Sequence, residues 1–154
     1  MLDLYEELKT VLAALDAAQV PYALCGGLAL AVHGHPRATV DIDLLVPSES
    51  IDAALHVLRS KGFEIAALPM TFFGGDVEIH RMSKVDTEAG DLLSVDLLVV
   101  TPKLSWIWQS RQTVSWEGSA LRVVSREGLI ALKKLRGSAQ DLADLHAIGG
   151  IDES

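Results

Sequence analysis

Cysteine and basic residues are both scarce in this sequence. Cys25 is the single cysteine among 154 residues, so neither an intrachain disulfide nor a cysteine-rich zinc site fits. The 13 lysines and arginines are outnumbered by 21 aspartates and glutamates, which gives a net charge of −8. Proteins that bind long nucleic acids through their phosphates normally have the opposite balance. We therefore expect no stable DNA binding, although a local basic patch for a brief contact with RNA is compatible with this charge.

Long hydrophobic runs and targeting signals are not apparent either. The first residues include Asp3, Glu6 and Glu7, where a signal peptide begins with basic residues. The longest apolar runs are far shorter than a membrane span, and glycine, histidine or aspartate interrupts them. With a single cysteine, the sequence predicts a cytoplasmic protein in a reducing compartment, with no membrane as a partner.

Several familiar catalytic and organisational patterns are also missing from the sequence. We find no P-loop, zinc-ligand spacing or Ser-His-Asp arrangement, and no internal repeat, low-complexity tract or linker. The composition, with 49% hydrophobic and 22% charged residues, is that of a globular protein. A chain of 154 residues is long enough for one hydrophobic core. The sequence therefore predicts a single domain over residues 1–154.

Apolar periodicity predicts a mixture of helices and strands. Leu8, Leu12 and Leu15 recur at spacings of three and four, which predicts an amphipathic helix over 2–19. The segment 102–116 is harder to interpret. This order of elements favours an α/β or α+β fold, a mixed β-sheet flanked by helices. The other expected elements are helices over about 28–33, 49–61, 126–136 and 140–148, strands over 22–25, 39–46, 63–68, 76–82 and 92–100, a hairpin of 113–116 with 120–124, and a loop over 69–75.

Two aspartates on one predicted strand form the most informative pattern. Asp41 and Asp43 are two residues apart, so their side chains project from the same face of the strand. Two neighbouring carboxylates repel each other, and burying either one without a partner is costly. Mg²⁺ prefers oxygen ligands, often one or two carboxylates together with substrate phosphates. The pair therefore predicts a Mg²⁺ site, with solvated strand-edge acids as the alternative.

A third aspartate lies in a strand that is otherwise almost entirely apolar. In residues 92–100 only Ser94 and Asp96 are polar, and a buried acid needs an opposite charge. If this strand neighbours the first, Asp96 completes a three-carboxylate cluster, which shares a metal ion or takes a proton from an attacking hydroxyl. The alternative is a structural ion pair of Asp96 with Arg37 or Arg81.

A pair of glycines precedes the short predicted helix. Gly26 and Gly27, interpreted as a turn, have no Cβ atoms, so the backbone there is able to approach a ligand closely. The N-terminus of the following helix presents free N–H groups and a partial positive charge, which suits phosphate. We therefore expect the glycine pair to hold a triphosphate whose metal ions lie on Asp41 and Asp43.

These motifs resemble the nucleotidyltransferase superfamily, whose best-known fold is that of polymerase beta. The shared pattern is a glycine pair, a short helix, Asp-x-Asp on a strand and a later strand aspartate. The extended form Arg37-x-Thr39-x-Asp41-Ile42-Asp43 is similar to small bacterial proteins of the branch that contains AbiEii-type toxins. The stretch 124–133, followed by 140–145, is also similar to that branch. The resemblance covers about residues 22–148.

The resemblance implies that a nucleoside monophosphate is transferred from a nucleoside triphosphate to an acceptor hydroxyl, with pyrophosphate leaving. It implies that Asp41 and Asp43 bind two Mg²⁺ ions, and that Asp96 binds one of them and helps to deprotonate the acceptor. The residues expected to contact the nucleotide are Gly26, Gly27, Arg37, Thr39 and Lys133. For Arg37 pairing with an acid is an equal alternative, and for Lys133 the alternatives are an ordinary helix surface or a bond to Asp141 or Asp144.

Three classes of acceptor remain open at this point. They are RNA such as a tRNA end, a protein hydroxyl as in a toxin–antitoxin pair, and a small molecule such as an antibiotic. A different possibility is a catalytically inactive module that binds a nucleotide or a partner protein. Gly27, where many relatives have serine, and the absence of the helical domain of larger members favour that alternative. The sequence does not indicate an oligomeric state.

Overall fold

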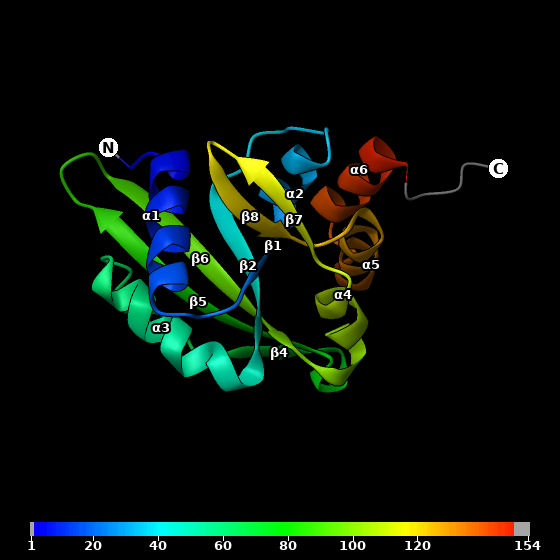
Figure 1. Ribbon diagram of the computed structural model, residues 1–154, viewed down its shortest axis with the longest axis horizontal. Helices are drawn as coiled ribbons and strands as arrows, with labels where there is room; N and C mark the ends of the chain where they lie inside the picture. The colour runs from blue at the N-terminus through cyan, green and yellow to red at the C-terminus, as the bar shows by residue number, and fades with distance from the viewer. Residues whose placement is uncertain (1, 150–154) are drawn as a thin grey trace.

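An eight-stranded mixed sheet forms the centre of the protein (Figure 1). The computed structural model describes residues 2–149. Along the sheet the strands follow the order β3-β5-β6-β2-β1-β8-β7, and β4 pairs with β5 beside β3. The pairs β2–β6 and β1–β8 are parallel, which makes the sheet mixed, as predicted. The strands are β1 (Ala23–Cys25), β2 (Asp41–Pro47), β3 (Ile65–Ala66), β4 (Met70–Phe72), β5 (Val77–Asp86), β6 (Asp91–Val100), β7 (Gln112–Trp116) and β8 (Ser119–Val123).

The helices lie around this sheet in two groups. In Figure 1, α1 and α3 lie together on the left, and α4, α5 and α6 lie on the right. Helices α1 and α3 contact each other and β2, whereas α2 contacts β1, β2 and α5. Within residues 2–149 no helix is long and apolar enough to cross a membrane. The helices are α1 (Leu4–Ala17), α2 (Gly26–Val32), α3 (Ile51–Ser60), α4 (Ser105–Gln109), α5 (Arg126–Arg136) and α6 (Ala139–Ile148), with short 3₁₀ turns η1 (Ser48–Ser50), η2 (Phe73–Gly75) and η3 (Pro102–Leu104).

Helix α1 shows how local sequence produces these elements. The side chain of Asp3 accepts a hydrogen bond from the Glu6 backbone N–H at 3.0 Å, so an N-cap begins the helix. The leucines that share one face, among them Leu8 and Leu15, are buried, with 2% and 0% of their surface exposed. The helix therefore forms because the cap and the buried apolar face both stabilise it, and it ends at Ala17, ahead of Pro21.

The two central strands are apolar except for their acids and Ser94. Ile42 and Leu44 of β2 and Val95 and Leu97 of β6 are completely buried. Parallel strands that are covered on both faces have such continuous apolar runs. The aspartates of β2 and β6 interrupt these runs, so the fold places its acidic groups in the middle of the sheet.

The structure corrects several predicted boundaries. The expected strand over 63–68 is only the two residues of β3, and the expected loop over 69–75 contains β4 and η2. The ten-residue β5 explains this difference, because one of its edges pairs with β3 near Met82 and with β4 near Val77. Such short strands depend on that partner rather than on their own pattern. The segment 102–116, which was hard to interpret from its sequence, contains η3 and α4.

Candidate active site

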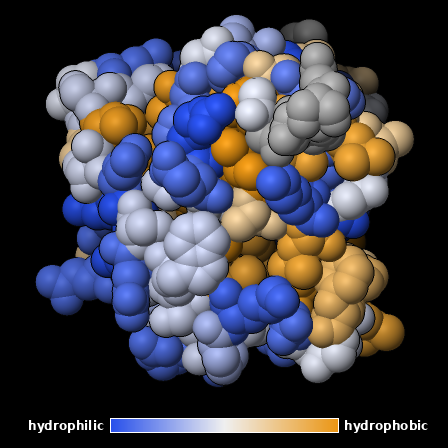
Figure 2. All heavy atoms as spheres, turned by 90° about the vertical axis from the view of Figure 1, so that its right-hand side faces the viewer, coloured by the Kyte–Doolittle hydropathy of each residue, from blue (hydrophilic) through white to orange (hydrophobic). Residues whose placement is uncertain are grey.

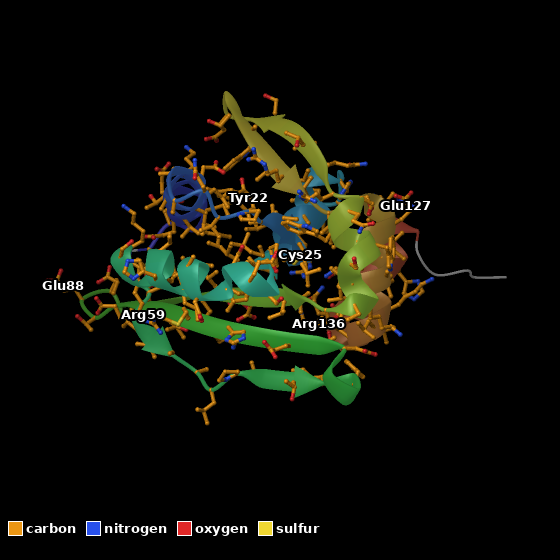
Figure 3. The ribbon with its side chains drawn as sticks, turned by 60° about the horizontal axis from the view of Figure 1, so that its bottom comes forward. Tyr22, Cys25, Arg59, Glu88, Glu127 and Arg136 are labelled. Carbon is orange, nitrogen blue, oxygen red and sulfur yellow. The ribbon has the colours of Figure 1, made fainter. Side chains whose placement is uncertain are left out.

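The parallel pairing of β2 and β6 brings the predicted acids together. Asp43 and Asp96 are direct register partners, and Asp41 is the partner of Ser94. On its other side, Asp43 faces Cys25 of β1. Figure 3 shows Cys25 in the middle of the molecule, which is where these strands meet. The condition that the strand of Asp96 neighbours the strand of the other two acids is therefore confirmed.

Asp41 and Asp43 both have raised pKa values. Burial raises the pKa of Asp43 to about 7, and the charge of Asp96 adds to the shift. Burial, followed by the charge of Asp96, also raises the pKa of Asp41. Among residues 2–149 no hydrogen bond or ion pair is made by either side chain. Both carboxylates are therefore in a setting that a bound cation would stabilise.

Asp96 differs from the other two acids because Arg81 of β5 pairs with it. The Arg81 Nε and Nη2 atoms donate to the two carboxylate oxygens of Asp96 at 2.7 and 2.9 Å. These hydrogen bonds raise the pKa of Arg81 above its usual range. The predicted alternative of an ion pair is therefore present, with Arg81 and not Arg37 as the partner.

No three-ligand metal site is formed in this arrangement. Across the part of the chain that the structure describes, no group of three or more His, Cys, Asp or Glu side chains is placed to hold a metal ion. The oxygen donors of Asp41 and Asp43 nevertheless fit Mg²⁺, because they share one strand face and lack other partners. Asp96 instead accepts hydrogen bonds from Arg81 at both of its carboxylate oxygens.

The two glycines begin α2 instead of forming a separate turn. Gly26 has a φ of +69°, and a Cβ atom built there would lie 2.1 Å from the Asp43 Oδ2 atom. A Cβ atom on Gly27 would lie 3.0 Å from Thr39 Oγ1 and 3.1 Å from the Arg37 Cζ atom. Glycine is therefore needed at Gly26, and the backbone at this end of α2 lies directly against Asp43.

Arg37 and Lys133 meet at a buried aspartate. Arg37 donates from Nε and Nη2 to the two carboxylate oxygens of Asp144 at 2.7 and 2.9 Å. The Lys133 Nζ atom lies 2.8 Å from Asp144 and 3.5 Å from Asp141. Although burial raises the pKa of Asp144, hydrogen bonds from Arg37, Lys133 and Gln140 outweigh it and lower that pKa to about 2. These contacts connect the segment before β2 to α5 and α6.

Most of these residues line one cavity of about 320 Å³. All eight residues proposed from the sequence line it: Gly26, Gly27, Arg37, Thr39, Asp41, Asp43, Asp96 and Lys133. Sequence reasoning did not assign Arg81, Arg136 or Gln140 to the site, although all three line the cavity as well. Arg136 lies at the end of α5 (Figure 3), and its positive charge lowers the pKa values of Asp41 and Asp43. The only signal for Arg136 in the sequence is the basic cluster that it forms with Lys133 and Lys134.

The sequence also matches a known family. A family model described as "uncharacterised nucleotidyltransferase" matches residues 2–132. The comparison with curated proteins gives no match.

Solved structures show the same fold at low sequence identity. An antigenic nucleotidyltransferase-like protein from Paracoccidioides brasiliensis is 22% identical with a TM-score of 0.57, covering 94% of this chain and 73% of its own. ANT(2″)-Ia in complex with adenylyl-2″-tobramycin is 16% identical with a TM-score of 0.64, covering 93% and 86%. The lincosamide antibiotic adenylyltransferase LnuA, bound to lincomycin, is 15% identical with a TM-score of 0.61, covering 96% and 97%. These similarities extend over nearly the whole chain.

Proposed function

The chain belongs to the family of uncharacterised nucleotidyltransferases, and we propose that it transfers a nucleoside monophosphate from a nucleoside triphosphate to an acceptor hydroxyl. One observation carries the proposal: Asp41 and Asp43, which lack partners among residues 2–149, face the same cavity as Asp96 and the glycine pair. This arrangement provides cation ligands, a phosphate site and a proton acceptor within one hollow of about 320 Å³.

Each part of the cavity has a role in this reaction. Asp41 and Asp43 would hold two Mg²⁺ ions, which neutralise charge on the phosphates when bound. Gly26 and Gly27 would contact the phosphates, as the resemblance implies, and the missing Cβ atom of Gly26 is what lets Asp43 lie against this end of α2. The positive charge of Arg136 already acts on both acids and is available to the triphosphate.

The transfer itself needs a proton acceptor beside the attacking hydroxyl. The hydroxyl oxygen bonds to the α-phosphorus, the bond to the bridging oxygen breaks, and pyrophosphate leaves. Asp96 takes the hydroxyl proton after Arg81 has moved from its carboxylate. Positioning and charge stabilisation carry this mechanism, and no covalent enzyme intermediate is required.

A second candidate is a module that binds a nucleotide without turnover. The observation that favours it is the Arg81–Asp96 pair, in which both oxygens of Asp96 are occupied. In that case Asp41 and Asp43 bind the metal–nucleotide complex, and Asp96 is structural.

Different observations support different classes of acceptor. The resemblance to AbiEii-type toxins supports RNA, such as a tRNA end, and a role in a toxin–antitoxin system. A protein hydroxyl is the acceptor of nucleotidyltransferase antitoxins that modify their partner toxin. The structural similarity to ANT(2″)-Ia, solved with adenylyl-2″-tobramycin, and to the lincosamide antibiotic adenylyltransferase supports a small molecule.

A transfer assay with a matched variant tests the proposal. The protein is incubated with Mg²⁺, each α-labelled nucleoside triphosphate in turn and a whole-cell extract, beside Asp43→Asn and the exposed control Asp52→Asn. We expect labelled product with the wild type and Asp52→Asn and at least a 100-fold loss with Asp43→Asn. Label transferred equally by Asp43→Asn would overturn the assignment. Mg²⁺-dependent nucleotide binding by calorimetry, without labelled product from any nucleotide, would instead favour the binding module.

A further inference from the structure

A second hollow, of about 340 Å³, adjoins the cavity that holds the acids. Apolar side chains from β4, η2 and β5, among them Met70, Phe72 and Phe73, form one side of it. Its other side includes Arg81 and Asp96, which also line the first cavity. Arg136 and Asp141 also line both cavities, so the two hollows meet along a charged edge that includes the Arg81–Asp96 pair.

The second hollow lies on the opposite side of Asp96 from the glycine pair. Gly26, Gly27, Asp41 and Asp43 line the first cavity only. In the sheet, β4 and β5 lie beyond β6, whereas the glycine pair follows β1 beyond β2. A nucleotide whose phosphates contact the glycines therefore leaves the second hollow open, with Asp96 between the two.

The wall of this hollow exposes aromatic surface. Phe72 is 44% exposed and Phe73 is 53% exposed, with their ring centroids 6.3 Å apart. Val77 and Ile79, which are buried, complete the apolar side. Hydrophobic residues gather in the lower right part of the face in Figure 2, beside hydrophilic ones. Pockets for small molecules have this character, with apolar walls and a few polar groups that fix orientation.

We propose that this hollow binds the acceptor, and that the acceptor is a small molecule with a hydroxyl group next to an aromatic or alkyl face; this rests on the proposed nucleotidyl transfer. The apolar face lies on Phe72 and Phe73, and the hydroxyl reaches Asp96. Once Arg81 has moved from the Asp96 carboxylate, the hydroxyl oxygen bonds to the α-phosphorus, pyrophosphate leaves, and the proton passes to Asp96. A volume of about 340 Å³ suits a small molecule, and the net charge of −8 opposes an RNA backbone.

Binding is tested without any requirement for activity. ¹⁵N-labelled protein is titrated with 3-phenyl-1-propanol as the probe and with 1,3-propanediol as the probe that lacks an aromatic face. We expect amide shifts in β4, η2 and around Asp96, and at least tenfold weaker binding of the diol. Phe72→Ser should lower the affinity for 3-phenyl-1-propanol at least fivefold. Leu68→Ser is the control, because this side chain is 87% exposed and lies outside the hollow, and it should leave the affinity unchanged.

A second variant, Phe73→Asn, and the nucleotide transfer assay distinguish the possible outcomes. Phe73→Asn is compatible with the φ of +55° at this position, because asparagine tolerates positive φ. It should lower the affinity for 3-phenyl-1-propanol as Phe72→Ser does. Shifts outside the hollow, or equal binding by both phenylalanine variants and the wild type, would overturn the proposal. Label that passes from nucleotide to RNA or protein in the extract, at the same rate in Phe72→Ser, would also overturn it. Probe binding with no transfer to any acceptor would refute the enzymatic activity and with it the acceptor role, and would leave the hollow as a small-molecule site only.

Discussion

At Gly26 two separate demands exclude any other residue. Its φ is +69°, and an added Cβ atom would lie 2.1 Å from the Asp43 carboxylate. Gly90 has a similar φ of +72°, but nothing lies within 4 Å of its Cβ position. Gly90→Ala therefore isolates the cost of the backbone conformation, about 1 to 2 kcal/mol, from the cost of displacing the acid.

We expect Gly26→Ala to destabilise the fold by more than Gly90→Ala, and to abolish Mg²⁺-dependent nucleotide binding as well. Its methyl group would push the Asp43 side chain out of position, since the residues that follow in α2, Gly27 to Leu30, are buried. Urea-induced unfolding and calorimetric titration with Mg²⁺ and nucleotide measure the two effects. Equal losses of stability in both variants, with nucleotide binding retained in Gly26→Ala, would contradict the close contact.

At the scale of elements, one buried aspartate joins α5, α6 and the segment before β2. Asp144 is 2% exposed and accepts hydrogen bonds from Arg37, while Lys133, at 5% exposed, pairs with the same carboxylate. Removing one member of a buried charge pair leaves the other without compensation, at a cost of about 3 to 5 kcal/mol. We therefore expect Asp144→Asn to destabilise the protein by about 3 kcal/mol in urea-induced unfolding.

A second substitution checks the cause of that loss. In Asp144→Asn the Lys133 ammonium keeps only the more distant Asp141 carboxylate, at 3.5 Å. If the loss of its nearer counter-charge is responsible, Lys133→Met in the Asp144→Asn background should restore part of the stability, because a methionine of similar length needs no counter-charge. A double variant that is less stable than Asp144→Asn alone would show that Lys133 contributes through other contacts.

Some helices and strands could be predicted from the sequence and others could not. Helix α1 and the central strands were predictable, because their apolar spacing is local and continuous. The strand β4 was not, because Met70–Phe72 pairs only with β5 and has a partly exposed pattern. Five-residue α4 is too short for periodicity to reveal it.

The candidate site divides in the same way. Local spacing was sufficient to single out the glycine pair and the two aspartates of β2. The contact of Arg37 with Asp144 joins residues 107 apart, so spacing along the chain gave no reason to choose it over a phosphate. Arg81 was considered as a partner for Asp96, but only the register of β5 with β6 places the two opposite each other.

At the scale of the whole molecule, the acid cluster links stability to pH. Folding raises the pKa of Asp43 from 3.8 to about 7, so the folded state keeps a proton that the unfolded chain has lost. This contribution is fully present below about pH 4 and is lost as the pH rises through 7. The free energy of unfolding should therefore fall between pH 5 and pH 8 in the wild type, and fall less in Asp43→Asn, whose side chain does not ionise.

Mg²⁺ should oppose that loss if the pair binds it, because the metal selects the ionised, folded protein. At pH 8 and about 100 times its dissociation constant, it should add about 2.7 kcal/mol to the free energy of unfolding of the wild type. The exposed control Asp52→Asn should gain the same amount and Asp43→Asn much less, and the wild-type gain should shrink at pH 5, where Asp43 keeps its proton. Urea-induced unfolding at both pH values measures this. Equal gains in Asp43→Asn and the wild type would remove Asp43 from the metal ligands.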